Sequence, residues 1–169
     1  MELESAIRSR RTHKAYGPDP VDRALLGELL ELARWAPNHH LTNPWRFRVV
    51  GPEALVRLKA AAGAAAASKL DRAPTLVVVS CTVDNDPIVA EEDLCATACA
   101  AYIVLLAAHD RGLAGYWRTP GFLRSDAGRA AAGLGPRERF VGLLHLGSPR
   151  QSREVPERLA VGDYVSWLA

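Results

Sequence analysis

A basic segment near the N-terminus is the first place where the residue types could do chemistry. Arg10 and Arg11 are adjacent, and the hydroxyl of Thr12 follows them directly. Guanidinium groups form charge-assisted hydrogen bonds with phosphate oxygens, and a neighbouring hydroxyl can add another. The pattern indicates a phosphate site, although charge alone favours a solvated basic arm. A nucleic-acid-binding arm would need a second basic patch with interleaved aromatic side chains, which the sequence lacks.

A second candidate lies between residues 35 and 45. This stretch carries two tryptophans, two asparagines and two histidines, namely Trp35, Asn38, His39, His40, Asn43 and Trp45. Aromatic surfaces suit a flat heterocycle, and amides can hydrogen-bond its polar edge. Adjacent histidines could serve acid–base or metal chemistry, but no further ligand stands at metal-site spacing. The alternative interpretation is one histidine facing solvent and the other bonding locally.

The third candidate is the stretch Gly115–Gly121, where Tyr116, Trp117, Arg118 and Thr119 are consecutive. Aromatic rings and hydrogen-bond donors at the end of a strand could contact a planar ligand. A buried tryptophan beside a surface arginine is an equally ordinary explanation. None of the three segments decides a function by itself.

The elements that must position these residues follow from hydrophobic periodicity and from capping and breaking residues. The predicted helices cover residues 1–9, 20–36, 52–69, 88–111 and 125–134, and the predicted strands cover 45–50, 75–82, 113–117 and 140–146. Asp19 is the expected cap of the second helix, and the β-branched run 75–82 is the expected central strand. The longest helix would extend about 36 Å. Alternating helices and strands predict one α/β layered domain over residues 1–169.

The C-terminal segment Arg150–Ala169 contains Pro156 and Gly162 but ends in apolar residues, namely Tyr164, Val165, Trp167 and Leu168. An apolar terminus predicts docking, for which the sheet edge of a partner subunit is a suitable place.

Bulk properties set limits on the function. The chain has 169 residues and a net charge of +2, which is too small to indicate a nucleic-acid or membrane partner. The uncharged stretch Leu94–Ala108 is shorter than the ~20 residues that span a bilayer. The absence of a signal peptide predicts a cytoplasmic protein with reduced thiols, and Cys95 and Cys99 are expected to be packed core thiols rather than metal ligands. Glycine-rich dinucleotide, P-loop and metalloprotease motifs are missing.

The order of the motifs resembles that of the nitroreductase family. Its opening pattern is similar to Arg10–Lys14, followed by Trp35–Pro37 and then Asn43–Phe47. Its later segments are similar to Gly112–Arg118 and Val141–Pro149, so the resemblance covers nearly the whole chain. The forms Ala-Pro-Asn-His-His and Tyr-Trp-Arg-Thr are most similar to the compact branch of NAD(P)H nitroreductases. At two positions where the family usually has Asn and Gln, this chain has Leu41 and Asn43.

The resemblance implies an α+β three-layer sandwich, with a mostly antiparallel sheet flanked by helices. It also implies a homodimer with C-terminal strand exchange and FMN at the subunit interface. Eight residues are the implied cofactor-binding set: Arg10, Arg11 and Thr12 at the phosphate, Trp35 and His39 from the same subunit, and Trp117, Arg118 and Thr119 from the other. In the family the flavin carries the chemistry, so no catalytic side chain and no metal is implied.

The implied reaction is ping-pong hydride transfer. NADPH or NADH reduces flavin N5, and a nitroaromatic, quinone or similar small oxidant then takes the electrons. Arg118 is the candidate cation for the anionic reduced flavin. The alternatives are an FMN-binding or redox-sensing protein without turnover, and an FMN-dependent dehydrogenase or dehalogenase on the same fold.

Overall fold

The computed structural model describes residues 1–168, and a four-stranded sheet lies at its centre. The strands are β1 (Trp45–Val49), β2 (Thr75–Thr82), β3 (Ala114–Arg118) and β4 (Glu138–Gly147), in the order β1-β2-β4-β3. All three neighbouring pairs are antiparallel, as expected. Every predicted strand is present, and each end lies within two residues of its expected position.

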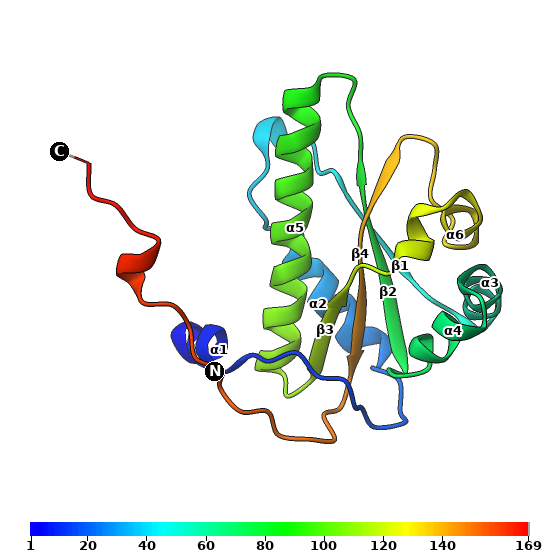
Figure 1. Cartoon of the computed structure of the whole chain (residues 1–169), viewed down its shortest axis with the longest axis horizontal. Coiled ribbons are helices and arrows are strands. Elements are labelled where there is room, and N and C mark those ends of the chain that lie inside the picture. Colours follow the sequence, from blue (N-terminus) through cyan, green and yellow to red (C-terminus); the bar gives the residue numbers. More distant parts are fainter. Residues whose placement is uncertain (169) are drawn as a thin grey trace.

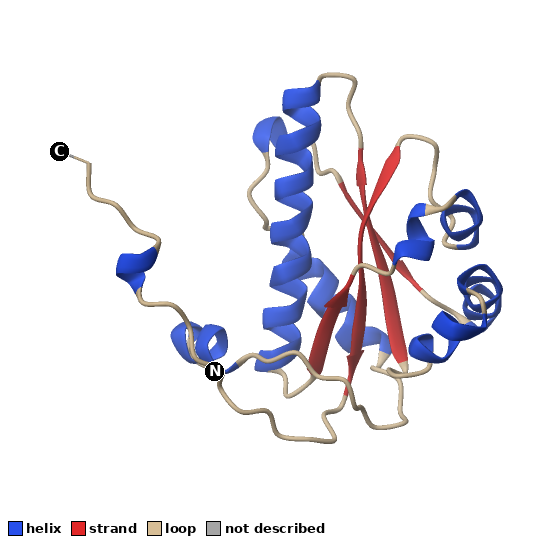
Figure 2. Ribbon diagram, viewed as in Figure 1, coloured by secondary structure: helices blue, strands red, loops and turns tan. Residues whose placement is uncertain are grey.

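Helices cover both faces of the sheet. They are α1 (Leu3–Ser9), α2 (Arg23–Ala33), α3 (Pro52–Ala62), α4 (Ala64–Ala67), α5 (Pro87–Asp110) and α6 (Asp126–Ala131), with 3₁₀ turns η1 (His39–Leu41), η2 (Ser68–Leu70), η3 (Gly121–Arg124) and η4 (Val161–Asp163). Figure 2 shows α2 and α5 on one face and α3, α4 and α6 on the other. The predicted three-layer sandwich is confirmed.

The two central strands are buried on both faces, which explains the nearly uniform apolar run in β2. Val77 and Leu144 face α2 and α5 in one core cluster, whereas Val78 and Leu143 face α3 and α6 in the other. Burying these faces removes apolar surface from water on both sides of one sheet. The sheet is therefore the rigid support for the loops at its ends.

Several predicted helix boundaries were wrong, including the ends of α2 and α6, which lie at Ala33 and Ala131 and not at residues 36 and 134. Asp22, not Asp19, caps α2, because its side chain accepts hydrogen bonds from the amides of Ala24 and Leu25. The helix expected over residues 52–69 is interrupted at Gly63, whose φ of 70° takes it out of the helical region. Proline before the second helix and alanine richness in the third suggested longer helices than tertiary packing allows.

The prediction of packed core thiols was wrong for Cys95 and Cys99, which are exposed, whereas Cys81 is buried in β2. Helix α5 buries the face that carries Ala96 and Ala100 against the sheet, so both thiols point to the opposite side. The surrounding alanines and leucines concealed which side of this helix is the buried one.

The C-terminal segment does not pack on its own sheet. In Figure 1 it extends from the end of β4 past α1 and away from α5. Its apolar side chains are exposed through residue 168, and Trp167 retains 93% of its accessible surface. Ala169 lies outside the described residues. No helix in the described part of the chain has the length and hydropathy needed to cross a membrane.

Candidate functional site

The basic N-terminal segment runs along the outer edge of β3. Thr12 forms a parallel bridge with Gly115, and the amide of His13 donates to the Gly115 carbonyl at 3.2 Å. This pairing places Arg10 beside α5, where its guanidinium carbon lies 5.5 Å from the centre of the Tyr102 ring. A cation over an aromatic face is attracted by the ring quadrupole, which orients Arg10.

Four arginines converge where this segment meets the C-terminal segment. Arg10, Arg11 and Thr12 line a small pocket of about 250 Å³ together with Arg153 and Arg158. The Arg11 Nε donates to the Glu154 carbonyl at 3.3 Å, which fixes the two segments to each other. We refer to this group of four arginines and Thr12 as the arginine pocket.

The sequence pointed to only half of these arginines. Arg153 and Arg158 lie in the segment that was interpreted as a docking tail, and their charge was therefore not assigned to a site. The usable signal was the density of basic residues between positions 150 and 158, where three of the nine residues are arginines.

The arginine pocket is suited to an anion. The Arg10 Nε is buried and has no hydrogen-bond partner among residues 1–168, so the protein itself leaves this cationic donor unsatisfied. The positive field is also felt by nearby histidines. Burial and then the charges of Arg10 and Arg11 lower the pKa of His109, and burial and then Arg153 lower the pKa of His13. A bound phosphate would neutralise charge that the protein leaves uncompensated.

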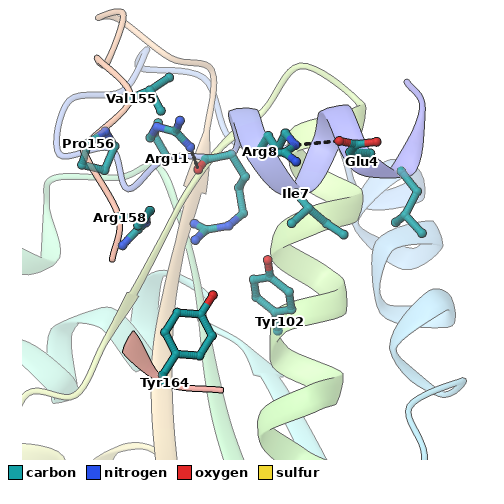
Figure 3. Close-up of a pocket in the computed structure, with 11 residues that line it drawn as sticks. Glu4, Ile7, Arg8, Arg11, Tyr102, Val155, Pro156, Arg158 and Tyr164 are labelled. Atoms are coloured by element: carbon teal, nitrogen blue, oxygen red, sulfur yellow. Dashed lines mark hydrogen bonds and ion pairs between the residues drawn. The ribbon is translucent and has the colours of Figure 1, made fainter. Parts of the chain in front are cut away.

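A larger hollow of about 940 Å³ adjoins the arginine pocket. It lies between α1, α5 and the C-terminal segment and shares Arg10, Arg11 and Arg158 with the pocket. In the view of Figure 3, Tyr102 of α5 and Tyr164 of the C-terminal segment lie below Arg11 and Arg158. The hollow therefore offers aromatic surfaces next to a cationic end.

The loop between α2 and β1 is strained. His40, Leu41 and Asn43 have φ values of 50°, 52° and 47°, in the left-handed region that favours glycine. The Thr42 hydroxyl donates to the carboxylate of Asp93 at 2.5 Å, and Asp93 is buried in α5. Such backbone strain persists only where surrounding contacts enforce it, and it concentrates at functional sites.

The strained loop presents bulky side chains to solvent. Trp35 and Leu41 retain 76% and 77% of their accessible surfaces, and His39 is also exposed. The amide of Asn43 turns back on the loop, because its Nδ2 donates to the Leu41 carbonyl at 2.6 Å. The shorter side chain at this position therefore stabilises the loop itself.

One chain does not bring the strained loop and the arginine pocket together. The loop is held at Asp93, in the first half of α5, whereas Arg10 lies over Tyr102 in the second half. Nine residues of helix separate these levels by about 13 Å. Trp35 and His39 therefore do not line the arginine pocket of their own subunit.

The third predicted segment is divided between the faces of β3. The Trp117 indole packs into the core on the α5 side and donates to the Val141 carbonyl at 3.3 Å. Arg118 points to the opposite face, where its Nη1 donates to the Lys69 carbonyl at 3.4 Å. Thr119 is exposed directly after the strand. None of these three side chains lines the arginine pocket.

Comparison with known proteins identifies the family. The model of the nitroreductase family matches residues 7–69, the part that carries the arginines and the strained loop. Two proteins named "Putative NAD(P)H nitroreductase" are similar over most of their length. YfhC of Bacillus subtilis is 29% identical over 95% of this chain and 91% of its own, and YdjA of Escherichia coli is 30% identical over 88% of each. The chain belongs to the nitroreductase family.

The fold of this nitroreductase-family protein is also that of solved relatives. A nitroreductase-like family protein from Bacillus cereus superposes with a TM-score of 0.91 at 26% identity, over 99% of this chain and 96% of that one. The correspondence includes the C-terminal segment, since nearly the whole of both chains is aligned. The exposed segment is therefore shared with this relative.

The contact between Thr42 and Asp93 makes a prediction about stability. Thr42→Val removes the hydroxyl and leaves a buried carboxylate without this donor, which should lower the free energy of unfolding by about 1–3 kcal/mol. Urea denaturation at pH 7 measures the change. Thr82→Val is the matched control, because the Thr82 hydroxyl makes only a 3.4 Å contact with the Pro44 carbonyl. Equal losses in the two variants would show that Asp93 does not hold the loop.

Proposed function

We propose that this protein is an FMN-dependent NAD(P)H oxidoreductase formed by one flavin-binding domain over the whole chain. The observation that carries the proposal is the arginine pocket, which four arginines line and in which the buried Arg10 Nε has no protein partner among residues 1–168. Its three cysteines are all free thiols, as is typical of the reducing cytoplasm, which we propose as its location.

The residues present fit FMN. Its phosphate carries up to two negative charges, and guanidinium groups recognise phosphate oxygens with two parallel hydrogen bonds. Arg10, Arg11, Arg153 and Arg158 supply more positive charge than Glu154, the one acidic residue lining the pocket, can offset. The adjoining hollow of about 940 Å³ has aromatic walls that suit the rest of the cofactor.

Support also comes from the relatives. YfhC and YdjA carry NAD(P)H nitroreductase in their names. When bound, FMN would supply hydride transfer from NADPH or NADH to a small oxidant such as a nitroaromatic or a quinone. We propose that this protein uses the same pair of half-reactions in turn, as a ping-pong enzyme.

The chain's own residues bind and orient in this mechanism. The arginine pocket holds the phosphate, and the Thr12 hydroxyl adds a hydrogen bond at the same end. The strained loop keeps His39 at a fixed position, where an imidazole N–H can donate to the polar edge of a ring. The exposed Trp35 offers a flat apolar surface that excludes water from a stacked ligand.

A homodimer completes this site. Because the strained loop and the arginine pocket lie at different levels of α5, we propose that each site combines the pocket of one subunit with the loop of the other. The exposed C-terminal segment would then pair with the partner's β1, which has a neighbour on one side only. An apolar groove of about 480 Å³ beside β1, lined by Val21, Leu26 and Val49 among others, can receive its side chains.

Anaerobic stopped-flow absorbance tests the function. The purified protein, loaded with FMN, should lose the visible absorbance of oxidised flavin when NADPH or NADH is added. Adding a quinone or a nitroaromatic should then restore it, since one oxidant consumes the stored electrons. Absence of bleaching with both nicotinamides would reject the oxidoreductase proposal.

A further inference from the structure

The outward face of α5 carries a stripe of exposed residues at helical spacing. Ile88, Glu91, Cys95, Cys99 and Tyr102 succeed one another at intervals of three or four residues and are all exposed. Residues at this spacing share one face of a helix. The two ends of the stripe are bulky, whereas its middle is formed by two small thiol side chains. A helix of another chain can therefore approach α5 most closely at Cys95 and Cys99.

The position of the two halves of the site sets how a second copy must lie on this face. The following inference rests on the dimeric site proposed above. For the strained loop at Asp93 of one copy to meet the arginine pocket at Tyr102 of the other, two α5 helices must pair antiparallel. The two-fold axis then passes midway between the levels of these residues, next to positions 97 and 98.

Charge supports the antiparallel orientation. Glu91 and Glu92 are exposed near the beginning of α5, whereas Arg10 and the pair of Arg8 with Glu4 lie beside its second half, where α1 packs. In an antiparallel pair the acidic end of each helix faces the basic end of the other, which favours this orientation over the parallel one.

The same axis brings two different cysteines together. A two-fold next to positions 97 and 98 places Cys95 within about 1.5 Å, along the helix axis, of the level of Cys99 in the second copy. Helices packed at axial distances of about 8–10 Å bring facing Cα atoms to about 3–5 Å, because each Cα lies about 2.3 Å from its axis. That separation overlaps the range found in disulfides.

We propose that Cys95 of each subunit forms an inter-subunit disulfide with Cys99 of the other, so that peroxide covalently closes the dimer. Each bond joins two Sγ atoms and removes one hydrogen from each thiol. One molecule of hydrogen peroxide accepts the two electrons and two protons and leaves as two molecules of water. Two such bonds, related by the two-fold axis, cross the interface at its centre.

Crossed pairing makes an unusual prediction for single variants. Wild-type protein treated with hydrogen peroxide should run as a covalent dimer on non-reducing gels, and dithiothreitol should return it to the monomer. Cys95→Ser and Cys99→Ser should each fail to form the covalent dimer, because each homodimer then lacks one member of every pair. Co-expressing the two variants should restore a covalent dimer, since the mixed dimer keeps one Cys95–Cys99 pair.

The controls separate this inference from the proposed function. Cys81→Ala should crosslink as wild type does, because Cys81 is buried in β2. The yield should not change on tenfold dilution if the thiols meet inside a preformed dimer. A covalent dimer in either single variant, through identical cysteines, would overturn the crossed pairing. Yellow dimers that never crosslink would reject the inference and leave the flavin site intact, whereas a colourless monomer would reject both.

Discussion

The Arg10→Ala, Arg11→Ala double variant should be purified without bound flavin. Both side chains line the arginine pocket, and the Arg10 Nε has no protein partner among residues 1–168. A hydrogen bond to a charged group contributes about 1.5–3 kcal/mol. Losing two such contacts should weaken FMN binding by about 10²–10⁴-fold, since each 1.4 kcal/mol corresponds to about a factor of ten.

Fluorescence titration of FMN into the apoprotein measures this loss directly. Lys14→Ala is the control, because Lys14 carries a nearby positive charge but does not line the pocket. It should bind FMN within about threefold of wild type, as expected when an exposed charge acts only through screened long-range attraction. The circular dichroism of all variants should be the same. If the double variant retains wild-type affinity, the phosphate is bound elsewhere.

Replacing His145 should remove an acid sensitivity of the fold. His145 lies in β4 between Leu76 and Tyr116 on the neighbouring strands, is completely buried, and neither ring nitrogen has a hydrogen-bond partner among residues 1–168. Burial, with smaller contributions from Arg118 and Arg72, lowers its pKa to about 3. The neutral ring is therefore the form that the folded protein accommodates.

The direction of the pH effect follows from this lowered pKa. In the unfolded chain the imidazole takes up a proton near its ordinary pKa of 6.5, whereas the folded protein does so only near pH 3. Acid therefore favours the unfolded chain below pH 6.5, and the free energy of unfolding falls by up to about 1.4 kcal/mol per pH unit. Between pH 6.5 and pH 5, above most carboxylate titrations, the loss should reach about 2 kcal/mol.

Urea denaturation at several pH values, at one saturating FMN concentration, tests the assignment. The stability of His145→Leu should vary less with pH over this range than that of wild type, by about 2 kcal/mol. His40→Asn is the control, since it removes an exposed imidazole at a left-handed position that asparagine tolerates. Parallel pH curves for wild type and His145→Leu would contradict the prediction.

Most of the architecture could be predicted from the sequence, because the strongest signals for the helices and strands are local. The β-branched, apolar run of β2 predicted a central strand, and Gly112, with a φ of 75°, follows the end of α5 as expected. The signals that failed were those that depend on tertiary packing. Whether Cys95 faces the core or solvent is decided by which side of an alanine-rich helix meets the sheet, and both sides look alike in sequence.

The residues of the candidate site could be predicted only in part, for a related reason. Arg10 and Arg11 were recognisable because they are adjacent to each other and to Thr12. Arg153 reaches the same pocket from a segment more than 140 positions away, held there by the contact of Arg11 with the Glu154 backbone. No local pattern encodes such a meeting. The separation of His39 from the arginines is likewise a property of the length of α5, not of any motif.

The exposed C-terminal segment would make the stability of the proposed dimer depend on the concentration of the protein. A subunit on its own gains almost no burial energy from Trp167 or Leu168, which retain 93% and 94% of their accessible surfaces. In the proposed dimer their contribution comes from a second copy and obeys mass action, so that dilution alone would weaken the fold. A scarce, newly made chain would then be the form most open to proteolysis, and its half-life would lengthen as the cellular pool grows.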